Sequence, residues 1–299
     1  MAACRQEAVH DGMESPTRQI EPSLLDSHVH FVDPSRPEGL VWPAPDSPLY
    51  RPALPSDLAA VYGGRPPSGC IAVETSRRES DDRWLLQLAA REPLVRGVVL
   101  NLQADLRDFE VRLENALEHD NFVGIRLRPI ADYDLSSGLL KDNLQRLGDA
   151  GKTVEFGARS GAQKAGFERL ANSLPNLLFI LDHAGHPPSS PDASFCAWQT
   201  GIREIALQPN TVCKVTGIAA RSERIFARLM ETFGERRLLY GSNWPVCALS
   251  AQEMTANLAC LTRFAGDAAT ALFSANAERA YRLDEAAKAA AAGTSGVSP

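Results

Sequence analysis

The chain contains 299 residues, 44% of them hydrophobic, and its 31 basic and 37 acidic side chains give a net charge of −6. No stripe or cluster of Lys and Arg runs along it, which argues against nucleic acid or an anionic membrane as its main partner. No apolar run is long enough for a membrane helix, and the six cysteines are scattered without a Cys-x-x-Cys pair. These features predict a cytoplasmic protein with reduced thiols.

The two ends of the chain differ in composition from the rest. Residues 1–21 mix acidic, basic and polar residues without periodicity, and we expect a disordered leader rather than a signal peptide. Residues 286–299 are rich in Ala and then Gly, Ser and Thr, which indicates a flexible tail. One folded domain is therefore expected over residues 22–285.

The first predicted strand, Leu24–His30, places two histidines one residue apart. Because side chains alternate faces along a strand, His28 and His30 point to the same side. Two adjacent imidazoles at the end of a strand are suited to hold a divalent metal or to orient a water molecule. An isolated His-x-His pair also occurs by chance, so the rest of the chain has to decide between these interpretations.

A strand followed by an amphipathic helix then repeats along the chain. A Pro-rich loop over residues 31–55 and a short helix ending near Val61 come before the repeats. The predicted strands are Leu24–His30, Cys70–Thr75, Val95–Leu100, Phe122–Leu127, Thr153–Phe156, Leu177–Leu181, Thr211–Val215 and Arg237–Tyr240. The predicted helices after them are Glu79–Glu92, Leu106–Glu118, Leu139–Ala150, Gln163–Ser173, Phe195–Leu207, Ser222–Phe233, Ala251–Phe264 and Ala268–Tyr281.

Eight apolar strands alternating with helices predict one parallel sheet covered on both faces, closed into a single-domain (β/α)8 TIM barrel of the α/β class. The alternative is an open doubly wound sheet, but no Gly-x-Gly-x-x-Gly follows the first strand to support a dinucleotide site. In such a barrel the chemistry lies at the carboxyl ends of the strands. This clustering favours a functional site over a chance pattern, because four of the six histidines fall at these ends: His28, His30, His183 and His186.

Several motifs, in this order, resemble those of the amidohydrolase family. They are Leu25–Pro34 (LDSHVHFVDP), Val123–Arg126, Leu181–Pro187 (LDHAGHP), Lys214–Gly217, Arg237–Val246 (RLLYGSNWPV) and Asn276–Leu283. Within the family they are similar to the sugar lactonases, such as fuconolactonase and rhamnonolactonase, and to pyrone-dicarboxylate lactonase. The resemblance implies a hydrolase that opens a small lactone by attack of water on its carbonyl.

The resemblance also implies roles for individual residues. His28 and His30 would polarise the lactone carbonyl, and His183 would hold or deprotonate the attacking water. Where the family usually carries an aspartate as general base, this chain has Asn243, an amide that cannot take a proton at neutral pH. Either another residue acts as the base, with His183 first and Glu74 behind it, or Asn243 only orients water or substrate.

Further substrate contacts are expected from polar and aromatic side chains at the same end of the barrel. Arg126 would pair with a carboxylate or with sugar hydroxyls, and Glu74 would accept hydrogens from hydroxyl groups. Trp42 and Trp244 would stack on a sugar ring or pack the mouth of the barrel. Lys214 is the last candidate, with an internal ion pair as its alternative.

The cofactor and the reaction class stay open on the sequence alone. His28, His30 and His183 could supply three nitrogens to a zinc ion, and the alternative is hydrolysis without a metal. The competing classes are a decarboxylase or isomerase of the same superfamily, against which Asn243 argues, and a catalytically silent binding protein, which Asn243 would permit. The expected partner is a small-molecule substrate, and a homo-oligomer is left open.

Overall fold

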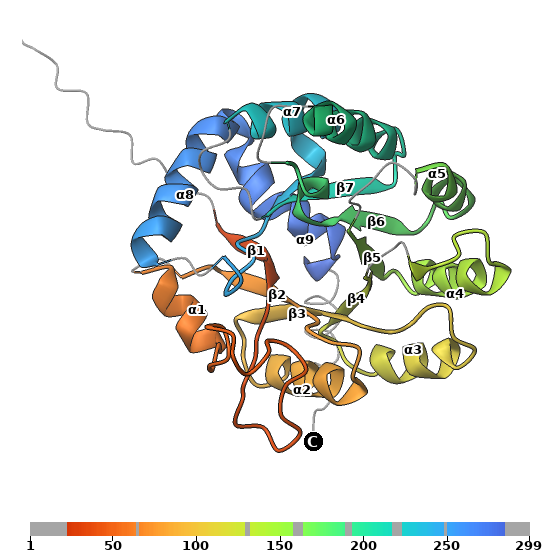
Figure 1. Ribbon diagram of the computed structural model, residues 1–299, viewed down its shortest axis with the longest axis horizontal. Helices are drawn as coiled ribbons and strands as arrows, with labels where there is room; N and C mark the ends of the chain where they lie inside the picture. The colour runs from red at the N-terminus through yellow and green to blue at the C-terminus, as the bar shows by residue number, and fades with distance from the viewer. Residues whose placement is uncertain are drawn as a thin grey trace, which may run out of the picture.

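The computed structural model describes residues 23–63, 66–128, 132–157, 164–188, 193–216, 223–247 and 250–284. The leader predicted over residues 1–21 and the tail predicted over residues 286–299 lie outside this part of the chain. Within it, strands and helices alternate as the sequence predicts, and the (β/α)8 barrel is confirmed (Figure 1).

Eight parallel strands form one sheet in the order in which they occur along the chain. They are β1 (Leu25–Val29), β2 (Gly69–Val73), β3 (Val95–Leu100), β4 (Phe122–Leu127), β5 (Thr153–Phe156), β6 (Leu178–Leu181), β7 (Thr211–Val215) and β8 (Leu238–Tyr240). The barrel closes between β1 and the residues after β8: the N–H of His30 donates to the carbonyl of Trp244 (2.8 Å), and the N–H of Asn243 donates to that of His28 (2.9 Å). Closure therefore brings these side chains together at the carboxyl ends of the strands.

The strands form because short runs of Val, Ile, Leu and Phe can be buried on both faces of a parallel sheet. The inner face packs into one apolar cluster that includes Leu25, Ile71 and Val99, and the outer face packs against the helices. The bounds of β3, β4, β5 and β7 agree with those predicted, and the other four strands differ by one or two residues at an end.

Helices surround the sheet, as Figure 1 shows. They are α1 (Pro55–Val61), α2 (Glu79–Ala89), α3 (Phe109–Leu117), α4 (Gly138–Asp149), α5 (Lys164–Ser173), α6 (Ala193–Ala206), α7 (Glu223–Phe233), α8 (Ala251–Ala265) and α9 (Asn276–Ala280). In α4, the side chain of Ser137 caps the first turn, and Leu140, Leu144 and Leu147 are fully buried on one face. No helix in the described ranges is both long and apolar enough to cross a bilayer.

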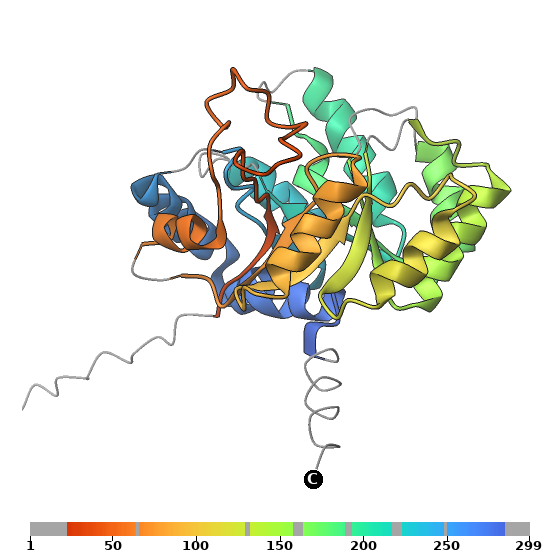
Figure 2. The same cartoon turned by 90° about the horizontal axis from the view of Figure 1, so that it is seen from below.

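The two ends of the barrel differ, as the side view in Figure 2 shows. α9 closes the amino-terminal end, where the side-chain amide of Asn276 donates to the carbonyls of Glu235 (2.7 Å) and Leu238 (2.8 Å), and Tyr281 joins the apolar cluster inside the barrel. At the opposite end the long loop over residues 31–54, between β1 and α1, rises above the strands. The carboxyl end of the barrel is therefore the end that can take a ligand.

Candidate active site

At the carboxyl end of β1, the imidazoles of His28 and His30 lie edge to face. Their Nε2 atoms are 3.3 Å apart, and the ring planes are 88° apart. His28 is fully buried, and His30 is 5% exposed. Nδ1 of His30 lies 3.0 Å from the carbonyl oxygen of Val73, at the end of β2. The alternation of side chains along β1 thus places both rings on the same side.

The turn after β6 brings in the third imidazole. Residues 183–186 all have positive φ, between 51° and 67°, which is a strained backbone for residues other than glycine. The indole N–H of Trp198 donates to the carbonyl of Ala184 (2.8 Å) and stabilises the turn from α6. The turn places the ring of His183 with its centroid 4.7 Å from that of His28.

Arg126, on β4, connects this third imidazole to two carboxylates. Its Nε donates to Oδ2 of Asp182 (2.7 Å), its Nη1 lies 3.6 Å from Oε1 of Glu74, and its Nη2 lies 3.4 Å from Nε2 of His183. Burial opposes the charge of the guanidinium, but Asp182 and Glu74 together raise the pKa of Arg126. The guanidinium therefore brings a permanent positive charge to the site.

Beneath the imidazoles, the ammonium of Lys214 lies among three acceptors. Its Nζ is 2.6 Å from Oε1 of Glu155, 3.0 Å from Nδ1 of His28 and 3.6 Å from Oδ1 of Asp182. All four side chains are fully buried. Oε1 of Glu155 also accepts from the hydroxyl of Tyr281 (2.5 Å), which connects this ionic layer to the helix that closes the barrel.

Burial and nearby cations keep the three imidazoles neutral at physiological pH. Burial, followed by the charge of Lys214, holds the pKa of His28 well below its usual range. Burial and Arg126 lower the pKa of His30 to about 3. Burial also lowers the pKa of His183 to about 4, with Asp182 opposing this effect and Arg126 adding to it. Each ring therefore carries a single N–H.

Partners that can only donate or only accept decide where that N–H lies. The carbonyl of Val73 only accepts, so His30 carries its hydrogen on Nδ1. The guanidinium of Arg126 only donates, so Nε2 of His183 accepts there, and Nδ1 of His183 donates to Oγ1 of Thr216 (2.6 Å). Both rings consequently keep a lone pair on Nε2.

Asn243, three residues beyond β8, has a φ of 57°, a left-handed conformation that asparagine adopts more readily than most residues. Its Nδ2 lies 3.7 Å from Sγ of Cys247. Its Oδ1 is buried and has no hydrogen-bond partner among the described residues. A buried amide oxygen without a donor costs free energy, and this oxygen is where a water molecule or a substrate hydroxyl would bind.

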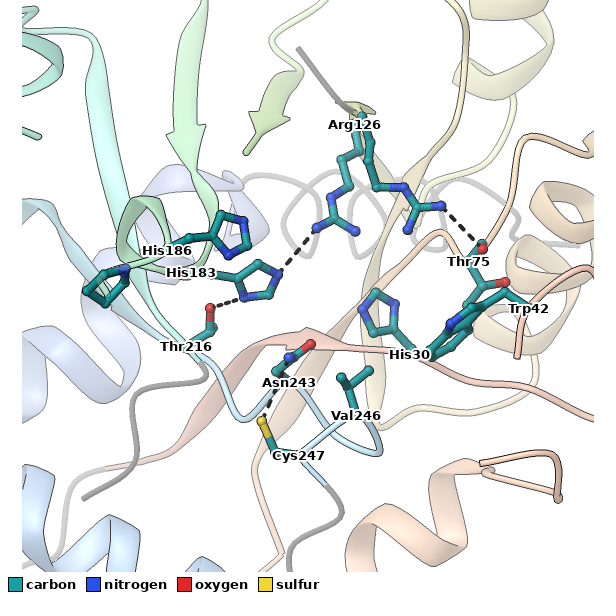
Figure 3. Close-up of a pocket in the computed structure, with 12 residues that line it drawn as sticks. His30, Trp42, Thr75, Arg126, His183, His186, Thr216, Asn243, Val246 and Cys247 are labelled. Carbon is teal, nitrogen blue, oxygen red and sulfur yellow. Dashed lines mark hydrogen bonds between the residues drawn. The ribbon is translucent and has the colours of Figure 1, made fainter. Parts of the chain in front are cut away.

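These side chains border a cavity of about 450 Å³ at the carboxyl end of the barrel, shown in Figure 3. Its lining residues are His30, Trp42, Thr75, Arg126, Arg128, His183, His186, Pro187, Thr216, Asn243, Val246 and Cys247. None of these is acidic and two are arginines, so this wall favours electron-rich groups. The indole of Trp42, from the loop after β1, lies with its centroid 5.7 Å from the ring of His30.

The cavity separates the residues singled out from the sequence into two sets. Five lie on its wall: His30, Trp42, Arg126, His183 and Asn243. Four lie behind it and are almost fully buried: His28, Glu74, Lys214 and Trp244. Of these, Glu74 and Lys214 form ion pairs with Arg126 and Glu155, and Trp244 packs on Phe31. The wall thus does not include the substrate contacts expected from Glu74, Lys214 and Trp244.

Sequence reasoning did not assign several residues of the wall to a site. Thr75 and Thr216 follow β2 and β7 by one or two residues, and that position was the available signal. Nothing in the sequence marks Cys247, which reaches the wall through the turn after β8. Asp182 and Glu155, which anchor Arg126 and Lys214, stand at strand ends as well, but both pairs join alternate strands across the inside of the barrel, and the predicted order of the strands does not specify such contacts.

One group of described residues has the spacing of a metal site. A ligand atom from each of His28, Glu155 and Asp182 lies within 4.8 Å of the others, and all three residues are buried. The ammonium of Lys214 already lies among these atoms, at 2.6–3.6 Å. Because two cations at such a separation repel strongly, the group does not fit a metal ion while Lys214 is charged.

Comparisons with known proteins bear on the whole described chain. Residues 25–283 match the sequence profile of a family described as amidohydrolase. An L-fucono-1,5-lactonase of Burkholderia ambifaria is 28% identical over 280 residues, which cover 87% of this chain and 96% of that protein. An L-fucono-1,5-lactonase of Burkholderia multivorans is 31% identical over an alignment that covers 89% of this chain and 98% of that protein.

Among solved structures, that of an amidohydrolase from Burkholderia multivorans with bound zinc is similar to this one, with a TM-score of 0.76. The two sequences are 23% identical, and the match covers 87% of this chain and 99% of the other. At this level of identity the likeness concerns the fold, and it agrees with the eight-stranded barrel described above.

Proposed function

The chain belongs to the amidohydrolase family, and from this premise we propose that it is a hydrolase that opens a small sugar-acid lactone by attack of water on the carbonyl. The two relatives that match over nearly their whole length are both named L-fucono-1,5-lactonase. L-Fucono-1,5-lactone and related aldonolactones are therefore the first substrates to test. The cavity of about 450 Å³ lies within the range of sites that enclose small molecules.

One observation carries the proposal. His183, Arg126 and Asn243 come from three different parts of the barrel and converge on one cavity (Figure 3). They offer a proton acceptor, a fixed positive charge and an amide oxygen that lacks a donor. Ester hydrolysis requires these three functions: activation of water, stabilisation of the oxyanion and orientation of the reactants.

The attacking water would bind between His183 and Asn243. One hydrogen would be accepted by Oδ1 of Asn243, the buried oxygen without a partner. The other would be accepted by the lone pair on Nε2 of His183, where the water would replace the long contact from Nη2 of Arg126 (3.4 Å). His183 would then take the proton as the carbonyl is attacked, while Thr216 holds its Nδ1–H in place (2.6 Å). Asn243 orients the water but takes no proton, because an amide is not a base at neutral pH.

Arg126 would stabilise the negative charge that develops on the carbonyl oxygen. Its Nε is fixed by Asp182, and its two terminal nitrogens lie toward Glu74 and His183, so the fork is held in one orientation. Charge that is fixed before the reaction lowers the barrier most, because nothing has to reorganise in the transition state.

This assignment differs from the polarisation of the carbonyl by His28 and His30 that the resemblance implies. The single N–H of His30 donates to Val73, and His28 lies behind the cavity wall. Neither ring therefore offers a donor to the carbonyl, and that function falls to Arg126. The lone pair on Nε2 of His30 would instead accept a hydrogen from His28 or from a hydroxyl of the substrate.

A screen against a panel of aldonolactones, with L-fucono-1,5-lactone first, tests the function. Each lactone opened near neutral pH releases one proton, so a pH indicator follows the reaction. We expect the purified protein to open at least one lactone roughly 100-fold faster than buffer does. If no lactone of the panel releases protons above the buffer rate, the hydrolase is overturned in favour of a ligand-binding protein.

The variant His183→Asn tests the mechanism. Loss of the proton acceptor should lower kcat by roughly 100-fold, with KM changed by less than about threefold, because general bases contribute 10²–10⁴ in rate. In the unmodified enzyme, kcat/KM should fall only as the pH drops through about 4, where His183 becomes protonated. The control is His119→Asn, at the exposed carboxyl end of α3. Full activity in His183→Asn would remove this residue from the mechanism.

A further inference from the structure

We propose that Lys214 is the resident cation of this site: its ammonium takes the position that a metal ion would occupy among His28, Glu155 and Asp182, and it fixes which nitrogen of His28 carries the proton. Lys214 is a positioning residue, because it lies behind the cavity wall and acts through His28. The inference rests on the proposed function for its link to lactone hydrolysis, whereas its tests need no substrate.

The surroundings of Lys214 match the bonding capacity of an ammonium. Nζ has three hydrogens and accepts none: it donates to Oε1 of Glu155 (2.6 Å) and to Nδ1 of His28 (3.0 Å), and it forms an ion pair with Oδ1 of Asp182 (3.6 Å). All four side chains are fully buried. Arg126 adds a second positive charge at Oδ2 of Asp182 (2.7 Å), so two cations face two carboxylates.

The same three acceptors are the group with metal-ligand spacing. Inside a protein, the repulsion between two cations a few ångströms apart is large, so this layer can hold either the ammonium or a metal ion. The ammonium is part of the folded chain, so it takes its place among the acceptors without the entropy cost of binding a free ion. We therefore infer that the layer is built for hydrolysis without a metal at this position.

Lys214 also fixes the direction of a chain of hydrogen bonds. Because Nζ only donates, Nδ1 of His28 accepts, and the hydrogen of His28 lies on Nε2. That hydrogen faces the lone pair on Nε2 of His30 (3.3 Å), and His30 in turn donates from Nδ1 to the carbonyl of Val73 (3.0 Å). A metal ion held by both Nε2 atoms would need the opposite tautomer of His28, which Lys214 disfavours.

The tautomer of His28 can be measured in the unmodified protein. Long-range proton–nitrogen NMR spectra of protein labelled with ¹⁵N-histidine distinguish the two neutral forms, and the signals of His28 are assigned from their loss in His28→Asn. We expect the form with hydrogen on Nε2. The form with hydrogen on Nδ1 would overturn the proposal, whether or not any lactone is hydrolysed.

The variant Lys214→Met tests the exclusion of metal ions. Methionine keeps much of the volume but removes the charge, and it leaves His28, Glu155 and Asp182 without their cation. We expect Lys214→Met to bind Co²⁺ with the absorption of a protein-ligated ion, roughly 100-fold more tightly than the unmodified protein. Equal affinity in the two proteins would overturn the proposal.

Two further variants complete the test. Lys152→Met removes another partly buried lysine, whose Nζ donates to the carbonyl of Phe122 (2.6 Å) at the opposite end of the barrel, and should not change Co²⁺ affinity.

Lys214→Met/Glu155→Gln removes one charge of each sign, and so remains testable if the single variant does not fold. In the double variant His28 should move its hydrogen to Nδ1, facing Asp182 (3.5 Å). Retention of the original tautomer would overturn the role of Lys214.

Discussion

The resemblance to the sugar lactonases implies an aspartate at the position where this chain has Asn243. Its backbone N–H donates to the carbonyl of His28, and its side-chain Oδ1 lacks a donor among the described residues. A carboxylate oxygen in the same place could accept a hydrogen bond from water and also keep the proton, whereas an amide oxygen can only accept the bond. In the proposed mechanism the amide would therefore orient water, and His183 would take the proton.

The variant Asn243→Asp should restore a second proton acceptor. We expect kcat/KM at neutral pH to rise by roughly 10-fold, which is less than a first general base contributes, because His183 already serves as one in the proposed mechanism. A new decrease in activity should appear as the pH falls through the pKa of the added carboxylate. The measurement is a pH–rate profile on the lactone that the panel identifies.

The matched control for this position is Asn243→Gly rather than an alanine variant. The backbone has a φ of 57°, which glycine adopts without strain, so the control removes the amide alone. Activity should fall by roughly 10-fold through loss of the bound water's partner. An Asn243→Asp enzyme slower than Asn243→Gly would contradict the orienting role of this side chain.

At this scale, local rules predicted some contacts and could not predict others. The spacing of His28 and His30 is enough to place both rings on one side, because alternation along a strand involves no other part of the chain. The position of Lys214 depends on acceptors from β5 and β6, and the length of its side chain allows either the wall or the layer below. The carboxylates that attract it decide the outcome, and the predicted order of the strands does not specify which side chains meet inside the barrel.

Among the elements, the loop over residues 31–54 forms one side of the cavity. Its base is closed by two hydrogen bonds between the backbones of Val32 and Ala53 (3.1 and 2.9 Å). Its middle is attached to α2, where Arg36 donates to Asp81 (2.6 Å) and lies over the ring of Trp84 at 4.7 Å. These attachments hold Trp42 against the site.

The variant Arg36→Met should release this loop. It removes a nearly buried ion pair, in which Arg36 is 7% and Asp81 4% exposed, and breaking such a pair from one side is strongly destabilising. We expect amide hydrogens of residues 33–50 to exchange faster with solvent. KM should rise by roughly 5-fold while kcat changes little, because Trp42 lines the cavity but takes no part in the reaction. The control is Arg83→Met, which removes an exposed pair with Glu79 on the same helix. Unchanged exchange and KM in Arg36→Met would refute the attachment.

Hydrophobic periodicity predicted the strands and helices well where the same pattern of burial continues along the whole segment. Each of the eight strands lies within two residues of its predicted bounds. The helix predicted over Ala268–Tyr281 is less regular, with a 3-10 turn at Gly266–Ala268 and a π turn at Ala271–Ala275 before α9. Its alanines favour helical backbone in general. The contacts of Asn276 with Glu235 and Leu238 at the end of the barrel set its position, and hydrophobic periodicity carries no information about such contacts.

At the scale of the whole molecule, many of the buried polar side chains lie near the carboxyl ends of the strands. Asp82, on α2, is one of these, outside the cavity wall: it is 6% exposed, and its Oδ1 accepts from the N–H of Asn101 (3.1 Å). Burial raises the pKa of Asp82 to about 8, with the hydrogen bond from Asn101 opposing this and the charges of Glu74 and Asp81 adding to it. At neutral pH this carboxyl is therefore protonated in the folded protein and ionised in the unfolded chain.

The stability of the protein should consequently depend on pH through Asp82. Between its unfolded pKa near 4 and its folded pKa of about 8, the folded state binds the extra proton, so the free energy of unfolding falls as the pH rises. The slope from this group is about 1.4 kcal/mol per pH unit. Asp82→Asn keeps an acceptor for Asn101 but cannot ionise, so the stability it gains over the unmodified protein should increase from pH 5 to pH 8 with that slope. Urea unfolding at each pH measures the difference, and Asp142→Asn, at an exposed position of α4, should show none. A gain for Asp82→Asn that is the same at both ends of the range would mean that Asp82 ionises in the folded barrel.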